Sequence, residues 1–221
     1  KITLLLFALF LAATSYGQVV LAGWEVSGIT DLSSGSSPYT FAAQTTATNI
    51  SGGDLTLGSG VNPATSAEQY GFKISGANEQ TTLAGAITNS HYIQFTLTAN
   101  SGFVFNLTSL EINGESSASG ADDIAVMSSV DGFTSGDQIA SLTGRQAVGA
   151  GDFDTDPSGF GSAINLSGSQ YQNLSSITFR IYGWNSTSGS SPTYIRDLSG
   201  DDLVLNGTTA ASAVPEPSTY A

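Results

Sequence analysis

Short runs of alternating apolar and polar residues are the feature that most constrains the fold of this chain. Apolar residues occupy every second position in Tyr92–Thr98, and Ser176–Gly183 repeats the pattern. A period of two gives a strand one apolar face for the core and one polar face for water. Between the two ends of the chain, no long segment has the spacing of three and four residues that marks an amphipathic helix. The pattern predicts antiparallel β-sheets.

Clusters of Gly, Ser, Asn and Asp separate these runs, as turns and loops separate strands. Many short strands with irregular loops predict an all-β fold in which two antiparallel sheets pack as a jelly-roll-like β-sandwich. The predicted strands are Val19–Val26, Gly71–Ile74, Tyr92–Thr98, Phe103–Asn113, Ile124–Ser129, Gln138–Leu142, Ser176–Gly183, Thr193–Arg196 and Leu203–Asn206.

The core of this sandwich has to form without disulfides, because the chain contains no cysteine. Hydrophobic residues make up 40% of the chain and aromatic residues 10%, which is enough for a packed core. The length of 221 residues suits one such domain, predicted over residues 18–208, with a short segment at each end.

The charge of the chain is small in amount and one-sided. Only 10% of residues are charged, and 18 acidic residues face 5 basic ones, for a net charge of -13. A polyanion repels nucleic acid and anionic lipid, so these partners are excluded. The same charge favours divalent cations, although acid-rich solubility alone also explains it.

The first residues have the pattern of a secretory signal peptide. Lys1 precedes the apolar stretch Leu4–Ala13, and the small residues Ser15 and Gly17 follow it. The apolar stretch is too short to span a bilayer. We therefore predict a signal peptide over residues 1–17, with cleavage before Gln18.

The last residues, 209–221, combine a small-residue linker with two prolines that flank a glutamate: Val214, Pro215, Glu216 and Pro217. Proline excludes helix and central strand here, so the segment is expected to be extended and accessible to a processing enzyme.

Val214–Pro217 resembles the start of the PEP-CTERM sorting signal of Gram-negative, exopolysaccharide-producing bacteria. Further segments, in their order, resemble the β-sandwich ectodomains of such proteins: Ala22–Gly28, Leu57–Val61, Ser128–Phe133, Phe179–Trp184 and Leu203–Gly207. The resemblance implies a surface or secreted location and a sorting protease as partner. It also implies transient membrane contact through an apolar span and basic cluster after the motif, which the printed chain, ending at Ala221, does not include.

Catalytic patterns are weak. His91 is the only histidine, so a Ser-His-Asp triad would have to use it, and no Gly-x-Ser-x-Gly motif accompanies it. We expect His91 to be exposed just before a strand. Glu111 and Glu115 would lie about 13 Å apart on one strand, too far for a glycosidase pair. The chain is therefore predicted not to be an enzyme.

Asp152, Asp154 and Asp156 alternate as the first ligands of a calcium loop do. Pro157 stands where an EF-hand needs glycine, so the alternatives are a different calcium loop or an acidic surface turn.

A second acidic cluster is Asp197, Asp201 and Asp202, and a turn before the last strand is enough to explain Asp201 and Asp202. If the first and last strands are neighbours, Glu25 comes near Asp197. A structural calcium ion would satisfy these carboxylates, and so would an ion pair with Arg180 or Arg196.

Candidate sugar contacts are aromatic residues with amides beside them. Tyr92, Tyr171, Tyr182 and Trp184 are the aromatic candidates, and core packing is the alternative for each. We expect Trp184 to be the most exposed, at a strand end beside Asn185.

These features predict an exported, non-enzymatic structural or interaction protein, sorted to the cell surface or to an extracellular matrix rich in exopolysaccharide. The alternative is a carbohydrate-binding module, with or without calcium, that grips a surface glycan through Tyr92, Tyr182, Trp184 and Asn185.

Overall fold

The computed structural model of the protein describes residues 19–29, 40–64, 68–74, 76, 78–147 and 151–213. The predicted signal peptide, residues 1–17, and the sorting motif Val214–Pro217 lie outside these residues. No helix within the described ranges is long and apolar enough to cross a membrane.

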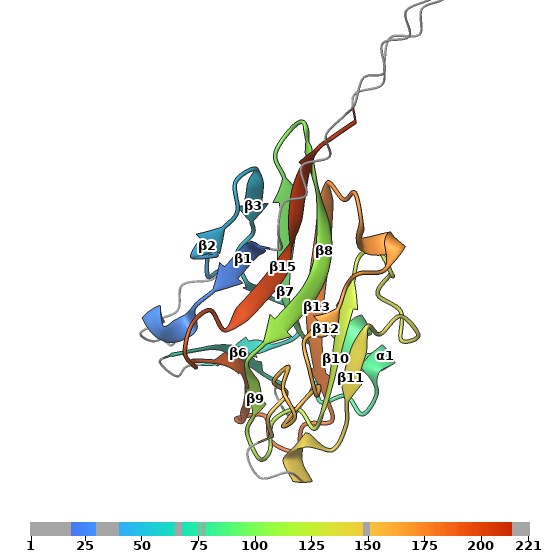
Figure 1. Ribbon diagram of the computed structural model, residues 1–221. Helices are drawn as coiled ribbons and strands as arrows, with labels where there is room; N and C mark the ends of the chain where they lie inside the picture. Colours follow the sequence, from blue (N-terminus) through green and yellow to red (C-terminus); the bar gives the residue numbers. More distant parts are fainter. Residues whose placement is uncertain are drawn as a thin grey trace, which may run out of the picture.

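Two antiparallel sheets lie face to face (Figure 1). The first has the strand order β12-β8-β15-β1-β2, and the second has the order β11-β10-β13-β7-β3, with β4 also paired to β7. The first sheet consists of β12 (Ile164–Asn165), β8 (Phe103–Ile112), β15 (Leu203–Ala211), β1 (Val19–Trp24) and β2 (Thr45–Thr46). The second consists of β11 (Ala140–Leu142), β10 (Asp123–Ser128), β13 (Ser176–Trp184), β7 (Tyr92–Ala99), β3 (Ile50–Gly52) and β4 (Thr56–Leu57).

A smaller sheet lies at one end of the sandwich, in the lower half of Figure 1. Its order is β5 (Asn62–Pro63), β6 (Gln69–Lys73), β14 (Pro192–Arg196) and β9 (Gly114–Ser116). Three 3-10 turns complete the described elements: η1 (Val26–Gly28), η2 (Arg145–Ala147) and η3 (Ser169–Tyr171).

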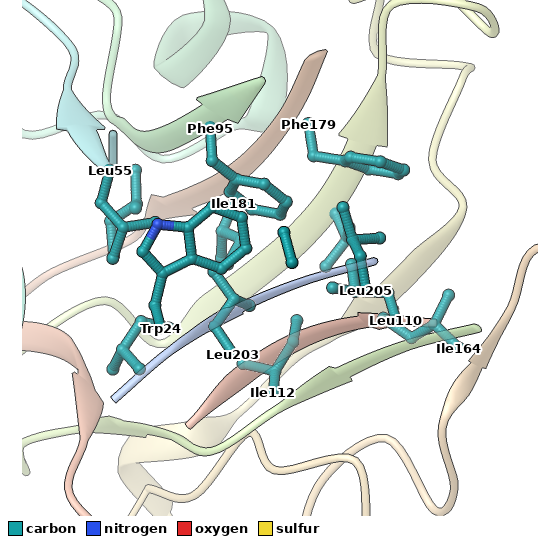
Figure 2. Close-up of a cluster of buried hydrophobic side chains, with 14 of the residues drawn as sticks. Trp24, Leu55, Phe95, Leu110, Ile112, Ile164, Phe179, Ile181, Leu203 and Leu205 are labelled. Atoms are coloured by element: carbon teal, nitrogen blue, oxygen red, sulfur yellow. The ribbon is translucent and has the colours of Figure 1, made fainter. Parts of the chain in front are cut away.

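The inward faces of the two large sheets share one apolar core. Trp24 of β1 packs against Phe95 of β7, with ring centroids 5.0 Å apart, and Phe95 stacks on Phe179 of β13 at 5.4 Å. Figure 2 shows these rings above leucine and isoleucine side chains of β8 and β15. Burying each such side chain contributes about 1.5–3 kcal/mol, so packing replaces the missing disulfides.

The outer face of the second sheet carries the one α-helix of the described residues, α1 (Leu83–Thr88). Thr82 caps this helix by accepting a hydrogen bond from the Gly85 N–H at 3.1 Å. Leu83 and Ala86 pack on residues of β10 and β13, which form a second apolar cluster there. The helix therefore covers part of a face that would otherwise be solvated.

The all-β, two-sheet antiparallel sandwich predicted from the sequence is confirmed, and each predicted strand is present with small shifts at its ends. The jelly-roll connectivity is not confirmed. The sequence pattern missed α1 and, apart from β11, the strands of two or three residues, because segments this short carry no readable alternation.

The expectation that His91 is exposed is wrong. His91 follows α1 and precedes β7 in the chain; its side chain is fully buried, and neither ring nitrogen has a hydrogen-bond partner among the described residues. Burial lowers the pKa of His91, because a charged imidazolium loses its hydration there.

This histidine should make the fold sensitive to acid. The unfolded chain takes up a proton near the ordinary pKa of about 6.5, whereas the folded chain does so only at lower pH. Stability is therefore fully present above that pH and is lost as the pH falls below it. His91→Gln should lose less unfolding free energy than the wild type between pH 7 and pH 5, measured by urea titration. Equal losses in the two proteins would contradict the burial of a neutral imidazole.

Candidate functional site

An arginine holds together three acidic residues where the small sheet meets a neighbouring loop. The guanidinium of Arg196 on β14 lies 3.1 Å from Asp152 and 3.4 Å from Glu115, and it also donates to Asp154. Asp154 is almost fully buried, and its second oxygen accepts a hydrogen bond from the Gly114 N–H at 2.7 Å. The ion pairs therefore join the loop at 152–154 to the strands β9 and β14.

The ion pairs of Arg196 determine what the carboxylates of the predicted calcium loop bind. Asp152 and Asp154 face the Arg196 guanidinium, which occupies the place that the prediction gave to a metal ion. Asp156 turns away and accepts hydrogen bonds from the backbone N–H and hydroxyl of Ser158 at 2.7 and 2.6 Å. The three carboxylates therefore do not converge, and the alternative, an acidic turn, describes Asp156 best.

Burial raises the pKa of Asp154, although the Arg196 hydrogen bond and charge act in the opposite direction. Desolvation is thus the larger effect, as expected for a carboxylate inside a protein. The Asp154 carboxyl therefore depends on the Arg196 guanidinium beside it to stay ionised at neutral pH.

The second predicted metal cluster does form. β1 and β15 pair along their length, and this pairing brings Glu25 to Asp197, as the sequence predicted. Asp202, to which the prediction gave a turn role, completes the group, since ligand oxygens of all three lie within 4.8 Å of one another. The predicted ion pair with Arg180 or Arg196 is wrong: Arg196 binds the cluster described above, and Arg180 lies between the rings of Tyr92 and Phe133.

Most of the lone pairs of Asp202 are already used. Oδ1 accepts hydrogen bonds from the Leu198 N–H at 2.7 Å and from the Asn113 amide at 3.2 Å, and Oδ2 accepts one from the Val26 N–H at 3.0 Å. Glu25 uses Oε1 to cap η1 through the Ser27 N–H. One lone pair of Asp202 Oδ2 and the Oε2 atom of Glu25 remain available. These two oxygens can share a proton, or they can bind a hard cation together.

Burial raises the pKa of Asp202, and the hydrogen bond that it shares with Glu25 acts in the same direction. Two carboxyls in contact are best neutralised by one proton or one cation. The chemistry of the donor set, all oxygen, is that of a calcium ligand set rather than of a zinc site.

The predicted sugar platform is largely covered. Tyr182 is fully buried and Trp184 is only 8% exposed, so the expectation of an exposed Trp184 is wrong. Both belong to the cluster under α1, with the half-buried Tyr92 at its border. Asn185 is held by its N–H, which donates to the Gln80 carbonyl at 2.6 Å, and by its amide, which donates to Asp123 at 3.2 Å. Tyr92, Tyr182, Trp184 and Asn185 therefore do lie together, but they pack within the protein instead of forming an exposed sugar-binding surface.

The catalytic candidates also serve the scaffold. Glu111 accepts a hydrogen bond from the Asn206 amide at 2.7 Å on the outer face of the first sheet. Glu115 faces Arg196 in the small sheet. These two carboxylates thus have separate partners in separate sheets.

The described surface contains a groove that the sequence did not reveal. Two adjoining hollows of about 450 and 370 Å³ share Ile139 and Asn165. We call them together the edge groove, because it runs between β11 and β12, the terminal strands of the two large sheets. Of the predicted aromatic candidates, Tyr171 lines it. The lining residues come from two segments, 131–142 and 160–171, which contain β11, β12 and the loops beside them, so no single local motif could have identified the groove.

The Arg196 cluster predicts a specific pattern of stability changes. Arg196→Met leaves Asp154 charged and buried, which should cost about 3 kcal/mol or more of unfolding free energy at pH 7. Because protonation relieves this charge, the deficit should shrink toward pH 4. Glu115→Gln, which removes a more exposed partner, should cost less than about 1 kcal/mol. Urea titrations of the three proteins measure these differences. Similar losses in both variants would contradict the inference that the buried charge of Asp154 causes most of the loss in Arg196→Met.

The calcium prediction for Glu25, Asp197 and Asp202 can be tested by thermal unfolding. Millimolar calcium should raise the melting temperature of the wild-type protein at pH 7, because a cation bound only in the folded state stabilises it. Glu25→Gln should abolish the increase, whereas Asp54→Asn, a change at an exposed carboxylate elsewhere, should retain it. A melting temperature that calcium and a chelator leave unchanged would show that a shared proton satisfies the cluster instead.

No family model, curated protein or solved structure matches this chain. The resemblance to PEP-CTERM ectodomains therefore stays a prediction from the sequence motifs, and the function has to be inferred from the chemistry of the residues.

Proposed function

We propose that this chain is an exported, non-enzymatic structural or interaction protein that associates with the exopolysaccharide of a cell surface or extracellular matrix. The observation that carries the proposal is the chemistry of the outer sheet faces. They present hydroxyl and amide groups that hydrogen-bond across strands, rather than rows of charges. Examples are Thr96 with Thr178 at 2.8 Å and Thr98 with Ser176 at 3.3 Å.

The first sheet presents the same chemistry on its own outer side. The Asn206 amide lies 3.3 Å from the Ser109 hydroxyl, and the Asn106 amide lies 3.5 Å from Thr208. Polar, uncharged surfaces of this kind can exchange hydrogen bonds with a hydrated polysaccharide without recruiting counterions.

The ionisable groups support a scaffold rather than a reaction centre. Within the described ranges His91 is buried without a hydrogen-bond partner, Asp154 is bound to Arg196, and Asp202 accepts three hydrogen bonds that fix the chain next to β15. Each perturbed pKa therefore has a structural cause.

Export and sorting rest on the two ends of the sequence, residues 1–17 and Val214–Pro217. The described sandwich is compatible with both. Val19, the first residue of β1, pairs with Gly207, and β15 continues to Ala211, so the first and last described strands begin and end on the same side of the domain.

The proposal can be tested by fractionation of an exopolysaccharide-producing Gram-negative host that expresses the native gene. The protein should be found outside the cytoplasm, without residues 1–17, and in the polysaccharide fraction. Replacement of Pro215, Glu216 and Pro217 by alanine should trap an unprocessed form, whereas the matched change Thr98→Ala should not. Recovery of the intact wild-type chain from the cytoplasm would overturn the proposal.

A further inference from the structure

The edge groove carries an inference about the ligand, which rests on the function proposed above. The groove is lined by side chains with hydrogen-bonding groups: two carboxylates, three carboxamides and three hydroxyls. These belong to Asp131, Asp137, Gln138, Asn165, Gln170, Ser141, Ser162 and Tyr171. No lysine or arginine is among its lining residues in the described part of the chain.

The two carboxylates are fixed in place before any ligand arrives. Asp131 accepts hydrogen bonds from the Ser128 hydroxyl at 2.6 Å and from the Tyr171 hydroxyl. Asp137 accepts them from the backbone N–H of Thr134 at 3.0 Å and from the Thr134 hydroxyl at 2.6 Å. Fixed acceptors of this kind bind hydroxyl donors without a further loss of side-chain freedom.

The second half of the groove adds an apolar surface. The half-buried Phe160 lines it together with Leu142 of β11 and Ile164 of β12. A sugar ring presents C–H groups on its faces and hydroxyls at its rim. A groove with apolar side chains in one half and oxygen acceptors in the other matches both parts of such a ring.

The negative charge of the groove determines which class of polysaccharide can bind there. Two carboxylates without a cation beside them in the lining repel uronic acids, phosphate and sulfate, and the net charge of -13 adds to this repulsion. The remaining class is an uncharged chain whose hydroxyls donate to the carboxylates and exchange hydrogen bonds with the amides.

A peptide strand fits the groove less well. Strand addition needs a long free edge, whereas β12 has two residues and β11 has three. Short edge strands of this kind are how sandwiches avoid pairing with other chains. The two hollows lie end to end along these edges, as an extended chain of sugar rings requires.

We propose that the edge groove binds an uncharged polysaccharide, with Asp131, Asp137 and Asn165 as hydrogen-bonding residues and Phe160 as the stacking residue.

The experiment uses the purified full chain in native affinity electrophoresis. Gels contain dextran, galactomannan or mixed-linkage β-glucan as uncharged probes, and alginate as the anionic probe. At least one uncharged polymer should retard the wild-type protein, and alginate should not. Retardation by alginate alone, or by none of these polymers, would overturn the inference.

Variants locate the binding surface. Ser141→Trp places a bulky side chain in the groove from an exposed position of β11, and it should weaken binding at least tenfold. Asn165→Asp retains the acceptor for the Ser167 N–H but removes the amide donor, and it should weaken binding severalfold. Ser59→Trp is the matched control, since it makes the same change at an exposed turn residue outside the groove.

Melting temperatures close to that of the wild type show that each variant folds. Equal binding by Ser141→Trp and the wild type would place the ligand elsewhere and overturn the inference. A dimer that Ser141→Trp dissociates would make the groove an interface between copies and overturn it too. In each of these cases the proposed export and surface location would stand, because fractionation of cells tests them separately.

Discussion

The contact between the indole of Trp24 and the ring of Phe95 joins the two sheets, and the rest of the structure depends on it. No disulfide is available to hold the layers together, so the inward rows of side chains have to do so by packing. The small sheet extends this core at one end, since Tyr70, Phe72 and Ile195 belong to it. The helix α1 covers a separate apolar cluster on one outer face, and the edge groove runs along one open side.

This chain has few positive charges, and its arginines bind other groups of the same chain. Arg196 binds three carboxylates, and Arg180 lies 4.4 Å from the Tyr92 ring centre and 4.1 Å from that of Phe133. Arg145 donates to the backbone carbonyls of Thr143, Asp152 and Ser158. Because these cations bind protein groups elsewhere, no lysine or arginine balances the two carboxylates in the described lining of the edge groove. This distribution underlies the preference for uncharged ligands that we propose.

The sequence predicted what local periodicity can encode and missed what tertiary packing decides. Alternation in β7 and β13 identified Phe95 and Phe179 as core residues, and the neighbouring positions of the first and last strands brought Glu25 to Asp197. It did not reveal that α1 covers Trp184, although Thr82 is a helix-capping residue and Leu83 and Ala86 have helical spacing. The edge groove was out of reach, since its residues meet only when the edges of two sheets are brought together.

The place of β15 in the first sheet has a consequence for the order of events in folding. This strand lies between β8 and β1, and it is also the last strand of the described residues. The sheet cannot close until residues 203–211 have left the ribosome or a translocation channel, because both of its neighbours pair with them. A chain that must pass through a narrow channel in an extended form is helped by such an arrangement. Because β15 leaves the ribosome or channel after both of its neighbours, the topology of the sheet delays premature folding of the domain.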